Sequence, residues 1–479
     1  MRLPRAATTV ALALTVPLLA TTTASAAPGT TTGGDSYFPA AGNGGYDVTH
    51  YGLGLKYDLD GRLDGTAVIT LTATTDLDSF SLDLRDLQAT TVLVDARKAS
   101  FSQIAAVDGP GGVGRVGGEL VITPKQRLRQ GSTHLVTVVY GGTPGTPTDQ
   151  TDSLYGWVST DDGAFVANEP EGASTWFPVN DVPTDKATYD FVINVPQGST
   201  AVANGEPVGK PLTFRGRTTY LWHAKDPMAS YLATASIGNY TMSSQTGPHG
   251  LPILNYVDPD TEAVDLDGDD VVDDPAAGLA QQSQMIAFLE GVFGRYPFSS
   301  FGAIVDDDTD PGYALETQTR PIYAGAPDEA TVVHELAHQW VGDSVTLARW
   351  QDIWLNEGFA TYAEWLWTES QGGPTVQERF DEVVDNTAPY ADWTVLPADP
   401  GVQDLFAWAV YDRGAATLQA LREQIGDRQF FSLLKKWTTQ NEGGNVTTED
   451  FIALAEKVSN SDLDALFQTW LYTPAKPAL

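Results

Sequence analysis

The stretch VVHELAHQWVGDSV, residues 332–345, places His334 and His338 four positions apart, with Glu335 directly after the first histidine. On a helix, residues i and i+4 point the same way, so both imidazoles can reach a single ion. Glu335 is rotated by about 100° from His334, beside the ligand pair, where it can act as a base toward water on the ion. The apolar residues around them would support the same helix without a metal, so a third ligand has to decide between the two interpretations.

A carboxylate downstream supplies that third ligand. In WLNEGFATYAEW, residues 354–365, Glu357 stands at the start of a second helical pattern. Eighteen residues separate it from His338, which leaves room for a turn and an antiparallel second helix. Two neutral imidazoles and one carboxylate favour zinc over calcium or magnesium, and they leave a fourth position open for water. The sequence therefore predicts one catalytic Zn²⁺ per chain, bound by His334, His338 and Glu357.

The rest of the chain divides by hydrophobic period. From Tyr46 to about Tyr240 apolar residues alternate with polar ones, which is typical of an antiparallel sheet. After about residue 275 the spacing becomes helical, so we expect an α+β protein with a β domain at 46–240 and a mainly helical domain at 241–479. Residues 27–45, rich in Gly, Thr and Pro, are expected to form a flexible lead-in. The helical patterns cover 328–342, with Asp328 as N-cap and Gly342 as stop, and 351–370, 411–425, 428–438, 448–458 and 462–472.

Residues 1–26 are typical of an export signal, with two arginines, a short apolar run and the small residues Ala24-Ser25-Ala26 at the cleavage point. The apolar run is too short to span a bilayer comfortably, so we expect a secreted protein, with an uncleaved anchor as the alternative. The net charge of −35 disfavours nucleic acid and anionic membranes as partners. The absence of cysteine excludes disulfides and thiolate ligands.

An acidic stretch at 258–275 resembles the start of a calcium-binding loop, with Asp265, Asp267 and Asp269 at alternate positions. Its glycine stands one position early, and no glutamate closes the loop at the expected place. A solvated acidic loop is the favoured interpretation, and a calcium site is the alternative.

The order H-E-x-x-H, eighteen residues, then the glutamate of N-E-G-F-A resembles the gluzincin family of aminopeptidase N and leukotriene hydrolase. The similarity extends to WFPVNDVPTDKATY (176–189), MASYLATASIGNY (228–240) and YPFSSFGAIVDD (296–307). The resemblance implies an N-terminal antiparallel β saddle domain followed by a thermolysin-like zinc catalytic domain, as in a short, secreted, bacterial-type member. A monomer is the favoured oligomeric state.

The same resemblance assigns the other site residues. Glu316, in YALET (313–317) where the family has G-A-M-E-N, would bind the substrate's free α-amine, together with Glu169 in NEPEGA (168–173). Tyr411, in VYDRGA, would donate a hydrogen bond to the oxyanion. The alternative for Glu169 is an ordinary loop acid, and from the residues alone Tyr411 would be a core residue at a helix start. Glu364 could support the metal ligands or simply face solvent.

The function implied is that of a zinc-dependent aminopeptidase, which hydrolyses the N-terminal peptide bond of peptides with zinc-activated water and Glu335 as general base. Two other enzymes stay open on the same site: a zinc endopeptidase and an epoxide-type small-molecule hydrolase. A non-enzymatic binding protein is the remaining class, and the intact set of His334, Glu335, His338 and Glu357 argues against it.

Overall fold

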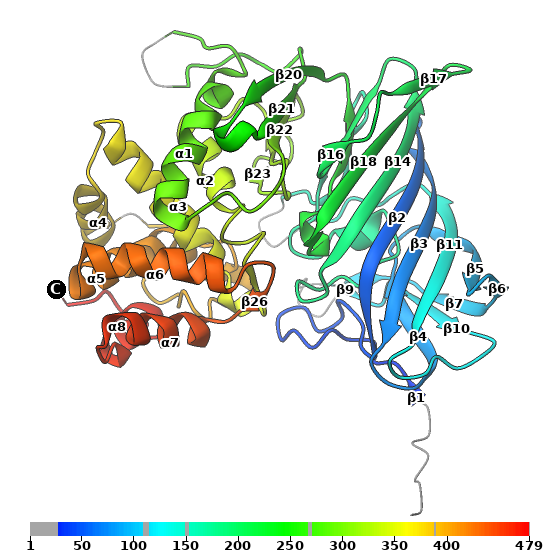
Figure 1. The fold of residues 1–479 in the computed structure, drawn as a ribbon, viewed down its shortest axis with the longest axis horizontal. Helices are drawn as coiled ribbons and strands as arrows, with labels where there is room; N and C mark the ends of the chain where they lie inside the picture. Colours follow the sequence, from blue (N-terminus) through cyan, green and yellow to red (C-terminus); the bar gives the residue numbers. More distant parts are fainter. Residues whose placement is uncertain (1–26, 109–114, 149–152, 267–270, 388, 479) are drawn as a thin grey trace, which may run out of the picture.

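A computed structural model describes residues 27–108, 115–148, 153–266, 271–387 and 389–478. Figure 1 shows strands in the first half of the chain and mostly helices in the second, which confirms the predicted α+β fold class. The expected signal at 1–26 lies outside the described residues, as do Asp267 and Asp269 of the acidic stretch.

A nine-stranded sheet forms the body of the first half. Its alternation follows the sequence, since Tyr51 and Leu53 on β2 are buried and Gly52 between them is partly exposed. One pairing differs from the prediction, because β2 and β14 run parallel, with Tyr51 opposite Tyr189. A half-buried strand has a hydrophobic period of two whether its neighbour is parallel or antiparallel, so the spacing of apolar residues could not distinguish the two pairings. The strands are β2 (Tyr46–Asp58), β3 (Arg62–Ala73), β5 (Gln88–Val94), β6 (Arg97–Lys98), β11 (Thr133–Gly142), β14 (Ala187–Pro196), β16 (Glu206–Pro207), β17 (Leu212–Phe214) and β18 (Arg217–Met228).

Smaller sheets complete the first half. One contains β1 (Ala27–Pro28), β4 (Leu77–Asp83), β7 (Ser100–Ile104) and β10 (Glu119–Thr123). Another contains β12 (Gly156–Ser159), β13 (Ala164–Ala167), β15 (Thr200–Ala203) and β19 (Ala235–Gly238). The strands β8 (Val107–Asp108) and β9 (Arg115–Val116) form a separate short pair.

The helical half also contains a five-stranded sheet that the sequence did not predict. Its central strand, β22, is buried along its whole length, so it reads as a continuous apolar run without a strand period. The strands are β20 (Thr241–Thr246), β21 (Pro252–Val257), β22 (Phe301–Asp306), β23 (Ala314–Leu315) and β24 (Ile322–Ala324), with β25 (Thr346–Leu347) and β26 (Asn445–Val446) as a separate pair.

The helices are α1 (Gln282–Phe293), α2 (Glu329–Ala337), α3 (Trp354–Ser370), α4 (Val376–Asp385), α5 (Gly414–Ile425), α6 (Asp427–Gln440), α7 (Thr448–Ser459) and α8 (Asp464–Leu471). Helix α4 was not predicted. In the part of the chain that is described, no helix combines the length and apolarity needed to cross a membrane.

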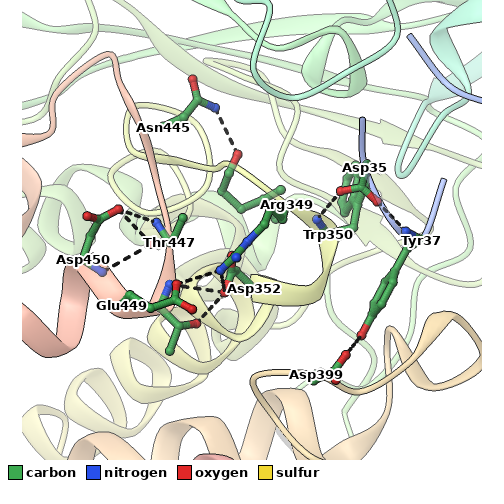
Figure 2. Close-up of polar contacts among 12 residues, drawn as sticks. Asp35, Tyr37, Arg349, Trp350, Asp352, Asp399, Asn445, Thr447, Glu449 and Asp450 are labelled. Atoms are coloured by element: carbon green, nitrogen blue, oxygen red, sulfur yellow. Dashed lines mark hydrogen bonds and ion pairs between the residues drawn. The ribbon is translucent and has the colours of Figure 1, made fainter. Parts of the chain in front are cut away.

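Residues 27–45, here called the strap, differ from the flexible lead-in that their composition predicts. Asp35 Oδ2 accepts a hydrogen bond from the backbone N–H of Trp350 at 2.9 Å. The hydroxyl of Tyr37 donates to Asp399 Oδ1 at 2.5 Å. Figure 2 shows both contacts, which fasten the strap to the helical half at the segment before α3 and at the segment between α4 and α5.

The indole of Trp350 lies between the strap and the interior. Phe38, only 3% exposed, packs edge-on against it with ring centroids 5.9 Å apart. On the other side Tyr231 packs at 5.2 Å, and its hydroxyl donates to the carbonyl of Gly342 and accepts from Asn356 Nδ2. The strap is thus connected, through two rings, to the turn after α2 and to the first turn of α3, the two helices of the predicted metal ligands.

Candidate active site

Helix α2 brings the two histidines to one face. The side chain of Asp328 accepts from the backbone N–H of Thr331 at 2.7 Å, which confirms the predicted N-cap. The rings of His334 and His338 lie 4.7 Å apart between centroids. The helix ends at Ala337 rather than at Gly342, because the chain turns directly after the second histidine.

Helix α3 supplies the carboxylate from its first turn. Glu357 Oε2 lies 3.1 Å from His334 Nε2 and 3.4 Å from His338 Nε2. One donor atom from each of the three residues therefore falls within a single cluster. Tetrahedral zinc with bonds of about 2.0–2.1 Å requires donors roughly 3.4 Å apart, so the chemistry and spacing of this set fit the ion.

The opposite ring nitrogens of both histidines are engaged. Nδ1 of His334 lies 2.5 Å from Glu364 Oε1, and Nδ1 of His338 donates to the carbonyl of Val341 at 3.0 Å. An acceptor at Nδ1 fixes the ring so that Nε2 presents its lone pair to a metal. The structure therefore gives Glu364 a place behind the ligand set rather than the solvent-facing alternative.

Glu335 lies beside the predicted metal ligands, because it directly follows His334 on α2. Its side chain is buried, and one of its oxygens belongs to a cluster with Glu316 and His338. Burial raises the pKa of Glu335 to about 8, against the opposing charge of the two histidines. A carboxyl in such a place can exchange a proton near neutral pH.

Glu316 follows the edge strand β23 and is held against α2. Gln339, which the sequence analysis did not single out, donates from Nε2 to the carbonyl of Glu316 at 3.1 Å. Its Oε1 accepts from the backbone N–H of Thr319 at 2.7 Å. The amide of one side chain thus fixes the loop after β23 to the helix that carries the histidines.

Glu169 comes from the first half of the chain and meets Glu316 at the metal set. One oxygen each of Glu169, Glu316 and Glu357 lie within 4.8 Å of one another. Among the described residues, Oε1 of Glu169 and Oε1 of Glu316 are buried and have no hydrogen-bond partner. Burial, together with the charge of Glu316, raises the pKa of Glu169 well above its usual range. Two buried, unsatisfied carboxylate oxygens form an incomplete site for a cation.

Tyr411 lies in a π-helical turn, residues 409–413, ahead of α5, which starts at Gly414 and not at 411 as predicted. Its ring stacks on His334 with centroids 6.0 Å apart. A close helix crossing allows this, since a Cβ on Gly358 of α3 would lie 2.9 Å from the backbone of Gly414. Burial and the charge of Glu357 raise the pKa of Tyr411 well above 10, so its hydroxyl is available as a donor.

One contact between the halves gave no signal in the sequence. Nζ of Lys186 donates to the carbonyls of Asp343, Ser344 and Gly444 at 3.1, 3.0 and 3.1 Å. The first two lie in the turn after α2. A lysine in a loop of the first half carries no local pattern that would reveal such a long-range role.

The comparisons with known proteins agree with this arrangement. The family described as Peptidase M1 N-terminal domain matches residues 47–232, and the Peptidase family M1 domain matches residues 316–470. Glutamyl aminopeptidase of Sus scrofa is 27% identical over 341 residues, which cover 66% of this chain and 35% of that protein. Aminopeptidase N of Streptomyces lividans is 26% identical over 350 residues, covering 65% of this chain and 38% of that protein. The chain therefore spans little more than a third of the length of these curated relatives.

A solved structure matches nearly end to end. The M1 zinc metallopeptidase of Deinococcus radiodurans superposes with a TM-score of 0.81 at 27% identity, covering 94% of this chain and 98% of that one. The two M1 domains follow each other here over more than two thirds of the sequence. On that ground the chain belongs to peptidase family M1, whose zinc metallopeptidases use one zinc ion.

Proposed function

We propose that this chain is a zinc-dependent aminopeptidase that removes the N-terminal residue from peptides. The observation that carries the proposal is a pair of buried carboxylate oxygens without a hydrogen-bond partner among the described residues, Oε1 of Glu169 and Oε1 of Glu316, beside the predicted zinc ligands. Each of these two oxygens lacks a hydrogen-bond donor. A protonated α-amine supplies three N–H donors together with one positive charge.

The other residues take their parts in hydrolysis from their positions. His334, His338 and Glu357 would hold the ion, which when bound supplies a Lewis acid for the scissile carbonyl and for water. Glu335 would accept a proton from the attacking water and deliver it to the departing amine. The Tyr411 hydroxyl would donate to the carbonyl oxygen as negative charge develops there.

Glu169 and Glu316 determine which peptide bond of the substrate is hydrolysed. With the ammonium at Glu169 and Glu316, the first peptide bond is the one within reach of Glu335 and the ligand set. An internal stretch of a polypeptide has no ammonium and would leave both carboxylates buried and unpaired, which is costly. The pair thus favours an exopeptidase over an endopeptidase. It does not favour an epoxide hydrolase, because an epoxide has no ammonium group to bind the carboxylates.

We further propose that the protein acts outside the cell. The support is the signal-like sequence at 1–26. N-terminal sequencing of protein from the culture medium should start at Ala27. Recovery of the full-length chain only from membranes would contradict secretion.

The enzymatic proposal is tested with a free-amine alanyl amide and its N-acetyl counterpart. Purified protein should hydrolyse the first, should lose this activity to a chelator and should recover it with zinc. His338→Ala should lose both zinc and activity. His223→Ala, a change at an exposed histidine on β18 paired with Asp190, serves as the matched control and should keep both. Faster cleavage of the N-acetyl substrate, or full activity in His338→Ala, would overturn the proposal.

A further inference from the structure

A cavity of about 140 Å³ opens beside the proposed amine site. Glu169 and Tyr411 both line it. In a bound substrate the first Cα carries the amine, the scissile carbonyl and the side chain. With the amine at Glu169 and the carbonyl oxygen near Tyr411, the side chain of that first residue has to point into this cavity.

The walls of the cavity are apolar and aromatic. The hydroxyl of Tyr313 donates to the carbonyl of Leu154 at 2.8 Å, which leaves the ring as the lining surface. That ring packs edge-on against Phe165 with centroids 6.3 Å apart, so the wall is fixed from behind. Besides Glu169 and Tyr411, the lining consists of Leu154, Tyr155, Tyr313, Ala314 and Phe406, with Ser153 beside them.

The charge around the cavity has one sign. None of its described lining residues is Lys, Arg or His, and its one ionisable acid is Glu169. Arg85 interacts electrostatically with Tyr155, but it is ion-paired with Glu171 at 2.5 Å and both are buried. A carboxylate that entered would lose its water, find no free cation among these groups and face Glu169.

We propose that this cavity selects substrates whose N-terminal residue is large and apolar, aromatic or branched aliphatic, and rejects acidic ones. The inference rests on the proposed aminopeptidase function and names its substrate class. It differs from the substrate that the name glutamyl aminopeptidase gives to the Sus scrofa relative. Burying a large apolar side chain against Leu154, Tyr313 and Phe406 supplies the preference. A lysine side chain would find Glu169 as its one carboxylate there, and the α-amine already occupies it.

The test is a panel of aminoacyl amides with Phe, Leu, Ala, Lys and Glu, measured as kcat/KM on the zinc-loaded protein. The kcat/KM for the Phe and Leu amides should exceed that for the Ala amide by about tenfold or more. It should exceed that for the Glu amide by about a hundredfold or more. Phe406→Ala should lower the ratio of Phe to Ala turnover by about tenfold. The matched control is Phe214→Ala, at a phenylalanine 72% exposed on β17, and it should leave that ratio unchanged.

The outcomes separate the two proposals. If Glu or Lys is the preferred N-terminal residue, or if Phe406→Ala lowers kcat/KM for all substrates by the same factor, the proposed specificity is wrong. The proposed aminopeptidase activity is unaffected by either result. If no free-amine substrate is cleaved while N-acetyl peptides are, the aminopeptidase proposal fails and the specificity falls with it.

Discussion

The glutamates around the two histidines have different proposed roles because each meets a different atom. Glu357 faces Nε2 of both His334 and His338, whereas Glu364 meets Nδ1 of His334 at 2.5 Å. Glu335 is buried beside the rings, in a cluster with Glu316 and His338. In the proposed mechanism one residue type would thus provide a ligand, a partner that orients a ligand, and a base.

These two last roles can be separated by a pair of matched amide substitutions. Glu335→Gln should keep zinc and fold but lose activity by about a hundredfold or more, because the amide cannot accept the proton from water. Glu364→Gln should instead weaken zinc binding by about 10–100-fold and regain most activity in excess zinc. Zinc titration combined with kcat measures both. Loss of less than about tenfold in Glu335→Gln would require a different base.

At the scale of elements, the strap joins the two halves of the molecule. Asp35 accepts a hydrogen bond from the backbone N–H of Trp350, and the hydroxyl of Tyr37 donates to Asp399 (Figure 2). Oδ1 of Asp35 also accepts from the backbone N–H groups of Tyr37 and Phe38. One short side chain therefore holds three backbone donors and fixes the strap to the segment that precedes α3.

Asp35→Ala should lower the free energy of unfolding by about 1–3 kcal/mol, since it leaves donors unpaired. Ser36→Ala, at the exposed neighbouring position, should change it little. Urea unfolding followed by fluorescence measures the difference. Equal stability of Asp35→Ala and the parent would mean that residues 27–45 are as loosely attached as their composition predicted.

Local pattern predicted the parts of the fold that local interactions determine. The N-cap at Asp328, the pairing of His334 and His338, and the period of two along β2 all follow from short-range spacing. Long-range geometry had no such signal: the parallel pairing of β2 with β14 and the walls of the cavity at Tyr155 and Phe406 depend on the folded chain. The π turn at Tyr411 was missed for a similar reason, since the close contact of α3 with α5 decides where α5 begins.

At the scale of the whole molecule, acids buried away from the metal site make stability depend on pH. Burial raises the pKa of Glu119, Asp185 and Asp306 to about 7 each. Between about pH 4 and 7 the folded chain therefore holds more protons on these groups than the unfolded chain does. Their contribution to the free energy of unfolding falls as pH rises through this window.

Asp306→Asn isolates one such group, because the amide keeps an acceptor for the backbone N–H of Asp308 and the contact with Tyr240 without a charge. The decrease in Tm between pH 5 and pH 7.5 should be smaller for the variant than for the parent, with zinc in excess throughout. Asp60→Asn, at an exposed loop position, is the matched control and should follow the parent. An Asp306→Asn slope as steep as that of the parent would show that Asp306 is ionised across the window.

The proposed ammonium site draws Glu169 from the first half of the molecule and Glu316 from the second, and Glu316→Ala tests it most directly. The decisive measurement is the ratio of free-amine to N-acetyl peptide turnover in the parent and in the variant, at equal zinc content. If the lost contact is worth ~3 kcal/mol, free-amine turnover should fall by roughly 10²-fold while the slow N-acetyl turnover changes little. An unchanged ratio would mean that Glu316 does not hold the amine, and the endopeptidase interpretation would then be the better one.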